Sequence, residues 1–416
     1  MSRLFAVVAA AASVWGFVAT PSHAPAHVAT ANVATANVAT AGPFPGTGRY
    51  LQHYAPTYMT PKTVYTLAQA VQIARSFDLI AAHQNNGFAA YIPQMKAANP
   101  NVRVLIYLNG SFVVPGQAST YPTTYYAHDA LGNKITSTNF GNYLMDVGNP
   151  AWASIVAGSC QSRLAAAPYD GCFVDMLGDT LVVHAGYLSS IPINPKTGLA
   201  WTAQDRMTAT TAIALTVATR IAPKLMMANG LAAGYRYYAT TAPTSQLLNG
   251  APSGQAETWL RQATRPATLF ETEAAWYQDV TMLANVTARG RAIAVTTKVW
   301  STATTAQIDQ WHKYSLASFL MGAQGTAYYA FLAPNTSAAF TQVYAWDNVA
   351  IGTPTSILLK YQNVYQRAYT GGIALVNVSA TASYTVTLAR ACTTLTGTSR
   401  VSSITLPPES GEVCHY

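Results

Sequence analysis

Residues Asp170–Asp175 read DGCFVD, a short apolar run of the kind that forms a buried strand and that ends on a carboxylate. The chain has only 15 Asp and Glu in 416 residues, so an acid in this position is not a common feature of the sequence. A second segment, Thr268–Glu271, ends in the same way, and Glu273 follows two residues later. Two carboxylates at strand ends, in a chain where strand and helix patterns alternate, predict an acid/base pair suited to glycosidic bonds.

Strand patterns recur along the chain from residue 49 onward. The candidates are Tyr50–Tyr54, Phe77–Ala82, Val102–Leu108, Gly171–Leu177, Lys224–Asn229, Thr268–Glu271, Ala292–Trp300 and Thr326–Phe331. Helix patterns lie between them, at Leu67–Arg75, Ala151–Leu164, Ala203–Ile221, Gln255–Gln262, Gln278–Arg289 and Thr305–Met321. Strands separated by helices pair in parallel through right-handed crossovers. This succession predicts an α/β protein with a (β/α)8 TIM barrel. An open doubly wound sheet is the alternative, but no strand is followed by a Gly-x-Gly-x-x-Gly turn.

The last part of the chain has a different pattern. Short strand-like runs separated by Thr, Gly and Ser turns begin near residue 358 and predict a small all-β sandwich domain. The expected organisation is a signal peptide at 1–24, a low-complexity leader at 25–48, a catalytic barrel at 49–357 and the β-sandwich at 358–416.

The N-terminus has the features of an export signal. Arg3 is followed by an apolar stretch, Leu4–Val18, and small residues at Ser22–Ala24 offer a cleavage site. That stretch is short for a membrane span, and no later segment is a better candidate. The leader repeats Val, Ala, Thr and Asn, a composition typical of a spacer. We therefore expect a secreted, extracellular protein with no membrane span in its mature form.

Charge and cysteine content agree with that location. The formal charge is +8, but charged residues make up only 9% of the chain and form no basic run, so nucleic acid is not an expected partner. The four cysteines suit an oxidising compartment, and their positions favour the disulfides Cys160–Cys172 and Cys392–Cys414, with free buried thiols as the alternative.

The expected catalytic side chains are Asp175 and Glu271. Cleavage of a glycosidic bond needs one carboxyl group that protonates the leaving oxygen and another that attacks the anomeric carbon or activates water. Glu271 has aromatic neighbours that would raise its pKa, which suits the acid, and Asp175 suits the nucleophile or base. Glu273 competes with Glu271 for the acid role or supports it. The alternative for Asp175 is a helix cap or a salt bridge.

Other polar or aromatic residues stand near predicted strand ends and could hold a sugar or support the acids. They are Tyr54, Tyr107, Asn109, Asn229, Lys298, Trp300 and Tyr329. The histidines lack the spacing of a metal site, so neither a metal nor another cofactor is expected.

Several of these segments resemble one known family. Tyr126–Lys134, Tyr143–Trp152, Asp170–Asp175, Glu271–Trp276 and Ala294–Trp300 are similar to segments of the GHL15-like group of barrel-type glycoside hydrolases, within the α-amylase-like superfamily. The resemblance covers about residues 49–335, and the C-terminal segment is similar to the small β-domain that trails α-amylase-like barrels. It implies Asp175 as nucleophile or base and Glu271 as proton donor. It implies a reaction class and no particular sugar.

We therefore expect a secreted glycoside hydrolase that acts on a poly- or oligosaccharide. The main alternative is a carbohydrate-binding or cell-surface protein that uses a barrel without catalysis, because fold does not establish activity. A cell-wall or capsule processing protein tethered through its leader is a third candidate.

Overall fold

The computed structural model describes residues 51–184 and 186–416, and the expected signal peptide and leader lie outside this range. Within it, eight parallel strands close into a barrel in the order β1-β12-β11-β10-β9-β6-β3-β2. The strands are β1 (Gln52–Ala55), β2 (Leu79–Ala82), β3 (Arg103–Asn109), β6 (Gly171–Asp175), β9 (Leu225–Asn229), β10 (Ser253–Ala256), β11 (Ala292–Lys298) and β12 (Ala327–Leu332). The predicted (β/α)8 barrel is confirmed.

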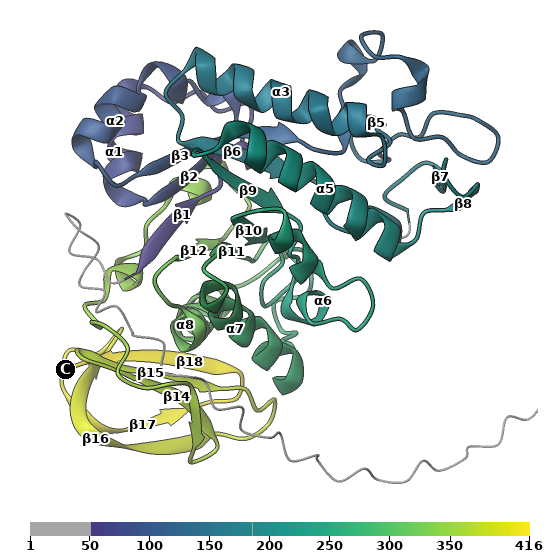
Figure 1. Cartoon of the computed structure of the whole chain (residues 1–416). Helices are drawn as coiled ribbons and strands as arrows, with labels where there is room; N and C mark the ends of the chain where they lie inside the picture. The colour runs from purple at the N-terminus through teal and green to yellow at the C-terminus, as the bar shows by residue number, and fades with distance from the viewer. Residues whose placement is uncertain (1–50, 185) are drawn as a thin grey trace, which may run out of the picture. The chain divides into compact units, whose positions relative to one another are not determined.

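Helices lie outside the strands, as Figure 1 shows for α3 and α5. The helices are α1 (Leu67–Ser76), α2 (Ile92–Ala98), α3 (Pro150–Ala166), α4 (Thr180–Val183), α5 (Ala203–Ile221), α6 (Gly234–Tyr237), α7 (Glu273–Ala288) and α8 (Thr305–Gly322). Their starts follow local rules: Thr66 caps α1 through a capping box, and Asn149 caps α3 with Pro150 in its first turn.

One predicted strand and one predicted helix are wrong. The sixth barrel strand is β10 at Ser253–Ala256 and not Thr268–Glu271, and the expected helix Gln255–Gln262 does not form. The sequence of β10 is SGQA, with no large apolar residue to signal a strand. Glycine is needed there because a Cβ on Gly254 would come within 2.6 Å of the Leu231 side chain. Tertiary packing therefore makes a strand of a segment with little strand propensity.

Side chains alternate between the barrel interior and the helix layer. The interior cluster includes Tyr54, Leu105, Phe173, Met227 and Ala294. Neighbouring residues on the same strands, such as Ala55 and Val174, belong to the larger cluster under the helices. This alternation decides which strand-end side chains can meet at the mouth of the barrel.

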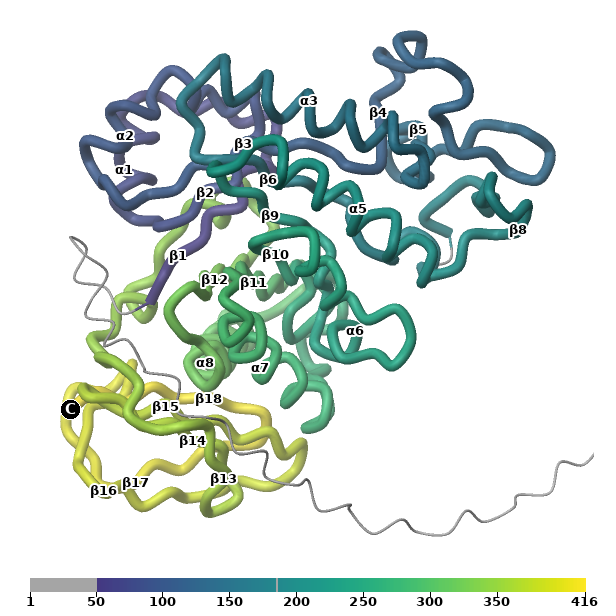
Figure 2. Tube along the Cα trace, viewed as in Figure 1, coloured from purple at the N-terminus to yellow at the C-terminus, as the bar shows by residue number. Residues whose placement is uncertain are grey.

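The segment between β3 and α3 is long and carries β4 (Phe112–Val113) and β5 (Tyr143–Leu144), and β7 (Ile193–Asn194) pairs with β8 (Leu199–Ala200) in a later loop. The two loops lie side by side in Figure 2, joined by a bridge between Ser137 and Leu188. Both follow barrel strands, so they extend the carboxyl end of the barrel, where sites form in this fold.

The C-terminal strands form a six-stranded antiparallel sheet in the order β13-β14-β15-β18-β16-β17. They are β13 (Leu359–Tyr361), β14 (Val364–Tyr369), β15 (Gly372–Asn377), β16 (Tyr384–Thr394), β17 (Val401–Leu406) and β18 (Ser410–His415). The predicted all-β character is confirmed. The core of this sheet joins Val364 and Leu375 to Val386 and Ile404, so strands from its two ends share one apolar interior.

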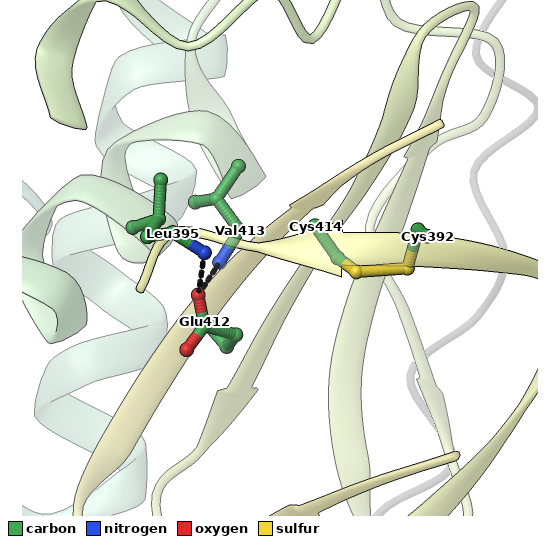
Figure 3. The surroundings of a disulfide bond; sticks show 5 residues. All are labelled: Cys392, Leu395, Glu412, Val413 and Cys414. Carbon is green, nitrogen blue, oxygen red and sulfur yellow. Dashed lines mark hydrogen bonds between the residues drawn. A yellow bond between two sulfur atoms is a disulfide. The ribbon is translucent and has the colours of Figure 1, made fainter. Parts of the chain in front are cut away.

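Both expected disulfides, Cys160–Cys172 and Cys392–Cys414, are present. The first ties α3 to β6, the strand that ends in Asp175, and the second ties β16 to β18. Figure 3 shows the second bond beside Glu412, whose carboxylate accepts hydrogen bonds from the backbone N–H groups of Leu395 and Val413. In the described part of the chain, no helix is long and apolar enough to cross a membrane.

Candidate active site

Asp175 lies at the carboxyl end of β6 and points into the barrel mouth, two residues after the interior Phe173. Its Oδ2 accepts a hydrogen bond from the Tyr107 hydroxyl at 2.9 Å. Its Oδ1 accepts from the Asn229 amide at 2.8 Å and from the Met176 backbone N–H at 2.7 Å. Both oxygens are therefore fixed in direction by side chains of β3 and β9 and by the backbone of the residue that follows β6.

Glu257 lies directly after β10 and is the second carboxylate of this cluster. Its Oε1 accepts from Lys298 Nζ at 2.7 Å, and its Oε2 accepts from the Asn229 amide at 2.6 Å and from the Tyr58 hydroxyl at 3.3 Å. About a third of the Glu257 side chain, 32%, stays exposed, while Lys298 is almost completely buried. The carboxylate is thus held firmly from one side and open on another.

Asn229 connects the two acids. The same amide nitrogen donates to Asp175 Oδ1 at 2.8 Å and to Glu257 Oε2 at 2.6 Å, so these two oxygens are no more than 5.4 Å apart. An amide nitrogen has two hydrogens, so it can make both bonds at once. A side chain at the end of β9 therefore fixes the separation of two carboxylates from β6 and β10.

The two carboxyl groups differ in charge state. Desolvation and the negative charge of Glu257 raise the pKa of Asp175 to about 6, although its three hydrogen-bond donors act in the other direction. Desolvation has the largest influence on Glu257 and acts to raise its pKa. The charge and hydrogen bond of Lys298, with the hydrogen bonds from Asn229 and Tyr58, together outweigh it and hold that pKa below its ordinary value. In the free protein Glu257 is therefore the ionised partner, and Asp175 is the one that holds a proton more readily.

Aromatic rings line the wall beside the acids. Tyr107 and Tyr58 are stacked with ring centroids 5.3 Å apart, and Tyr58 also contacts Phe173 at 4.6 Å. Trp300 packs against the same interior cluster, and Lys298 Nζ lies 4.9 Å from its ring. The Tyr54 hydroxyl donates to Gln255 at 2.8 Å, deeper in the barrel. Rings with hydroxyl groups at such a mouth can contact both the C–H faces and the hydroxyls of a sugar.

Asn109 has a supporting position. Its Oδ1 accepts from the backbone N–H groups of Ser111 and Phe112, and its Nδ2 lies 3.3 Å from the Tyr107 hydroxyl as a donor. It therefore orients Tyr107 toward Asp175 and shapes the start of the long loop after β3.

Three residues expected at the site have other surroundings. Glu271 does not end a strand: it precedes α7, and its carboxyl pairs with that of Asp279. Glu273 is the first residue of α7 and binds Lys360 and the Tyr365 hydroxyl, both at 2.6 Å. Tyr329 faces the helix layer, where its hydroxyl lies 2.6 Å from Ser315 Oγ. No hydrogen bond or ion pair among the described residues joins any of the three to Asp175 or Glu257.

The strand alternation places the Tyr329 side chain away from the barrel mouth. On β12 the residues that face the barrel interior are Tyr328, Ala330 and Leu332, and Tyr329 falls between them. For Glu271 the cause is different, because the expected sixth strand does not form. Glu271 is the carboxylate at the end of that expected strand, whereas Glu257 lies in a segment for which the sequence predicts a helix.

The structure brings the expected residues Tyr107, Asn109, Asn229, Lys298 and Trp300 to the barrel mouth with Asp175, and it places Tyr54 deeper in the barrel interior. Glu257, Tyr58 and Gln255 are the residues that sequence patterns missed. One signal was available: Glu257 is one of few acids and stands about as far after Asn229 as one strand–helix unit requires. Across residues 51–184 and 186–416, no three His, Cys, Asp or Glu side chains are grouped as a metal site would need.

Similar solved structures have low sequence identity to the chain. The cycloisomaltooligosaccharide glucanotransferase of Paenibacillus sp. is 11% identical, with a TM-score of 0.42 over 89% of this chain and 55% of that protein. The GH36 α-galactosidase AgaA of Geobacillus stearothermophilus is 11% identical, with a TM-score of 0.45 over 91% and 57%. An α-amylase of Anoxybacillus is 10% identical, with a TM-score of 0.49 over 88% and 95%. The chain thus spans little more than half the length of the first two proteins.

No curated protein matches the sequence of the chain. The model of one protein family does match, over residues 96–373, which is more than half of the chain. The matched range contains Asp175, Asn229, Glu257 and Lys298 and ends in β15. The chain therefore belongs to GHL15, the hypothetical glycosyl hydrolase family 15.

Proposed function

We propose that the protein is a secreted glycoside hydrolase that cleaves O-glycosidic bonds of a poly- or oligosaccharide, with Asp175 and Glu257 as its carboxyl pair. The observation that carries this proposal is the single amide of Asn229 that donates to both acids at the mouth of the barrel. The pair replaces the expected Asp175 and Glu271, because Glu271 has Asp279 as its partner.

The charge states support a division of roles. Lys298 stabilises the ionised form of Glu257, which suits the group that attacks the anomeric carbon. The pKa of Asp175, raised to about 6, suits the group that protonates the leaving oxygen. This assignment reverses the roles expected from the sequence, where Asp175 was the nucleophile or base and a glutamate was the acid.

The separation of the acids supports retention of configuration. Retaining glycosidases hold their carboxyl groups about 5–5.5 Å apart, and inverting enzymes about 6.5–9.5 Å apart to admit a water. The nearest oxygens of Asp175 and Glu257 are within 5.4 Å. In the proposed first step, Glu257 bonds to the anomeric carbon as Asp175 gives its proton to the departing oxygen. In the second step, Asp175 takes a proton from water, and the water oxygen displaces Glu257.

The remaining residues of the mouth have proposed supporting roles. Tyr107 and Asn229 hold Asp175, Lys298 holds Glu257, and Tyr54 fixes Gln255, which in turn donates to Tyr58 at 3.3 Å. Trp300 offers an aromatic face next to Lys298. Export is supported by two disulfides and by the signal-like N-terminus in the sequence.

The test is a set of matched carboxyl-to-amide substitutions. Asp175→Asn and Glu257→Gln should each lower the rate of sugar release from a polysaccharide substrate by about 10²–10⁴-fold, because each removes one partner of the acid/base pair. Glu271→Gln is the control and should keep most activity. The substrate is first identified by incubating the wild-type protein with a set of polysaccharides and measuring newly formed reducing ends.

The second candidate function is carbohydrate binding without catalysis. It would be favoured if wild type binds a polysaccharide but releases no sugar, and if Asp175→Asn binds equally well. Equal activity of wild type and Glu257→Gln would contradict the proposed pair, and loss of activity in Glu271→Gln alone would restore Glu271 as the acid.

A further inference from the structure

Arg206 is a buried cation behind the turn that follows Asp175. It lies on α5, and only 3% of it is exposed. Its Nη2 donates to Ser111 Oγ at 2.8 Å and to the Met176 carbonyl at 3.3 Å, while its Nε has no hydrogen-bond partner in the part of the chain that the structure describes. No ion pair among the described residues includes Arg206, and burial lowers its pKa to about 9. A buried guanidinium without an acid is costly, so its presence needs an explanation.

The turn that Arg206 contacts has unusual backbone geometry. Met176 has a φ of 59°, in the left-handed region that residues other than glycine rarely adopt. The Met176 carbonyl accepts a hydrogen bond from Ser111 Oγ at 2.6 Å as well as from Arg206. The Met176 N–H donates to Asp175 Oδ1 at 2.7 Å. The carbonyl of Met176 is therefore held by Arg206 and Ser111, and its N–H contacts the Asp175 carboxylate.

We propose that Arg206 is a positioning residue for Asp175: by holding the carbonyl of Met176, it keeps the Met176 N–H directed at the carboxylate. This inference rests on the proposed function, since it concerns one of the two proposed acids. Among the described residues Arg206 contacts neither acid. It holds the carbonyl of the Met176–Leu177 peptide, and the left-handed backbone of Met176 links this carbonyl to the N–H of the Asp175–Met176 peptide, which donates to the carboxylate.

Other ionisable groups also act on Asp175 and must be kept unchanged in a test. From the strands and loops around it they are Tyr54, Tyr58, Tyr107, Tyr187, Glu257 and, through Glu257, Lys298. Substitutions at Arg206 or Ser111 leave all six side chains in place.

The test compares Arg206→Met, Arg206→Lys and the control Arg220→Met, which removes an exposed arginine from the same helix. Two quantities are measured: the pH dependence of kcat/KM, and the titration of the Asp175 carboxyl by ¹³C NMR, assigned by its loss in Asp175→Asn. In Arg206→Met we expect the pKa of Asp175 to rise by about one unit, because its ionised form loses a hydrogen bond. We expect kcat to fall about tenfold with little change in KM. Arg206→Lys should restore most of kcat and bring the pKa of Asp175 back toward its wild-type value, since lysine can donate to the same carbonyl.

Unchanged titration and unchanged pH profile in a folded Arg206→Met protein would overturn the inference. If that variant does not fold, Ser111→Ala decides in its place, with a shift in the same direction expected and its absence overturning the proposal. The NMR titration is independent of turnover. If Asp175→Asn keeps wild-type activity, the proposed function fails, while the titration still tests the link between Arg206 and Asp175.

Discussion

Lys298 Nζ lies 2.7 Å from Glu257 Oε1, and this ion pair is asymmetric: the amine is almost fully buried, whereas the carboxylate is partly open. Lys298 is therefore shielded from solvent and paired with Glu257, whereas part of the Glu257 carboxylate remains accessible at the barrel mouth. The arrangement keeps Glu257 ionised and directs it, which is what a nucleophile needs.

Replacement of Lys298 by methionine should raise the pKa of Glu257, because the ammonium that stabilises its charged form is lost. The acid-side limb of the pH profile of kcat/KM should move to higher pH, and activity at its optimum should fall about 10²-fold. Lys313→Met is a matched control, since Lys313 also pairs with a glutamate, Glu412, at 3.4 Å. An unchanged acid-side limb in Lys298→Met would contradict the role of this ion pair.

Azide can assign the roles of the two acids. If Glu257 is the nucleophile, Glu257→Gly with azide should give a glycosyl azide of inverted configuration from an activated aryl glycoside. Asp175→Gly should keep hydrolysing glycosides whose leaving groups need no protonation and should give an azide of retained configuration. Product configuration is read by NMR. The opposite pattern would return the nucleophile role to Asp175.

Activity should also fall on the alkaline side. If Asp175 is the acid, kcat/KM should decrease as pH rises through about 6, since the group must be protonated to act. The same raised pKa means that Asp175 contributes stability below its unfolded pKa and loses it as pH rises through 6. Asp175→Asn should therefore have a higher Tm than wild type at pH 8 and no advantage at pH 4. A Tm deficit at pH 8 would argue against this charge state.

Glu271 and Asp279 form a second carboxyl pair with a different consequence. Asp279 is 1% exposed and accepts hydrogen bonds from the backbone N–H groups of Gly234 and Leu260. Desolvation, followed by the charge of Glu271, raises the pKa of Asp279, and desolvation raises that of Glu271. Both folded-state pKa values lie above their unfolded values, so the stability from this pair is present at low pH and is lost as pH rises through them.

Glu271→Gln should reduce this loss, because the pair can no longer carry two negative charges. Its Tm should exceed that of wild type by a margin that grows from pH 4 to pH 8. Glu273→Gln is the control with the opposite sign: Lys360 and Tyr365 lower the pKa of Glu273, so its small contribution is lost as pH falls. A margin that stays constant with pH would contradict the electrostatic interaction between Glu271 and Asp279.

The disulfides should contribute to stability separately. Cys160–Cys172 closes a loop with a sequence separation of 12, and Cys392–Cys414 closes one of 22. Loops of this size are worth about 3 kcal/mol in the free energy of unfolding. Replacing either pair by alanine should lower that free energy by about this amount in a denaturant titration. An excess of reductant should destabilise wild type and leave the variant lacking both bonds unchanged.

The barrel could be predicted from the sequence because most of its strands carry a local signal. Val104, Phe173 and Met227 belong to apolar runs that are buried whatever the register, and helix starts such as Thr66 and Asn149 depend on neighbours within three residues. Asp175 could be found for the same reason, since it ends such a run. Asn229 and Lys298 are the last residues of equally clear strands, so their place at the barrel mouth could be predicted too.

Glu257 could not be found in this way. Its strand, β10, is a strand because β9 and β11 pair with it on both sides and because Gly254 leaves room for Leu231. None of these partners is a local neighbour, and a helix was the better interpretation of the segment from its sequence alone. Glu271, in contrast, followed an apolar run that the fold uses as a loop before α7.

The amino-acid sequence by itself determined the ring of alternating strands and helices, the cysteine pairs and the acid at the end of β6, because each depends on residue type and spacing along the chain. Only the tertiary structure decided which second acid faces Asp175. That choice depends on the amide of Asn229, which donates to both carboxylates. It also depends on the pairing of β10, a strand whose residues have little intrinsic strand propensity.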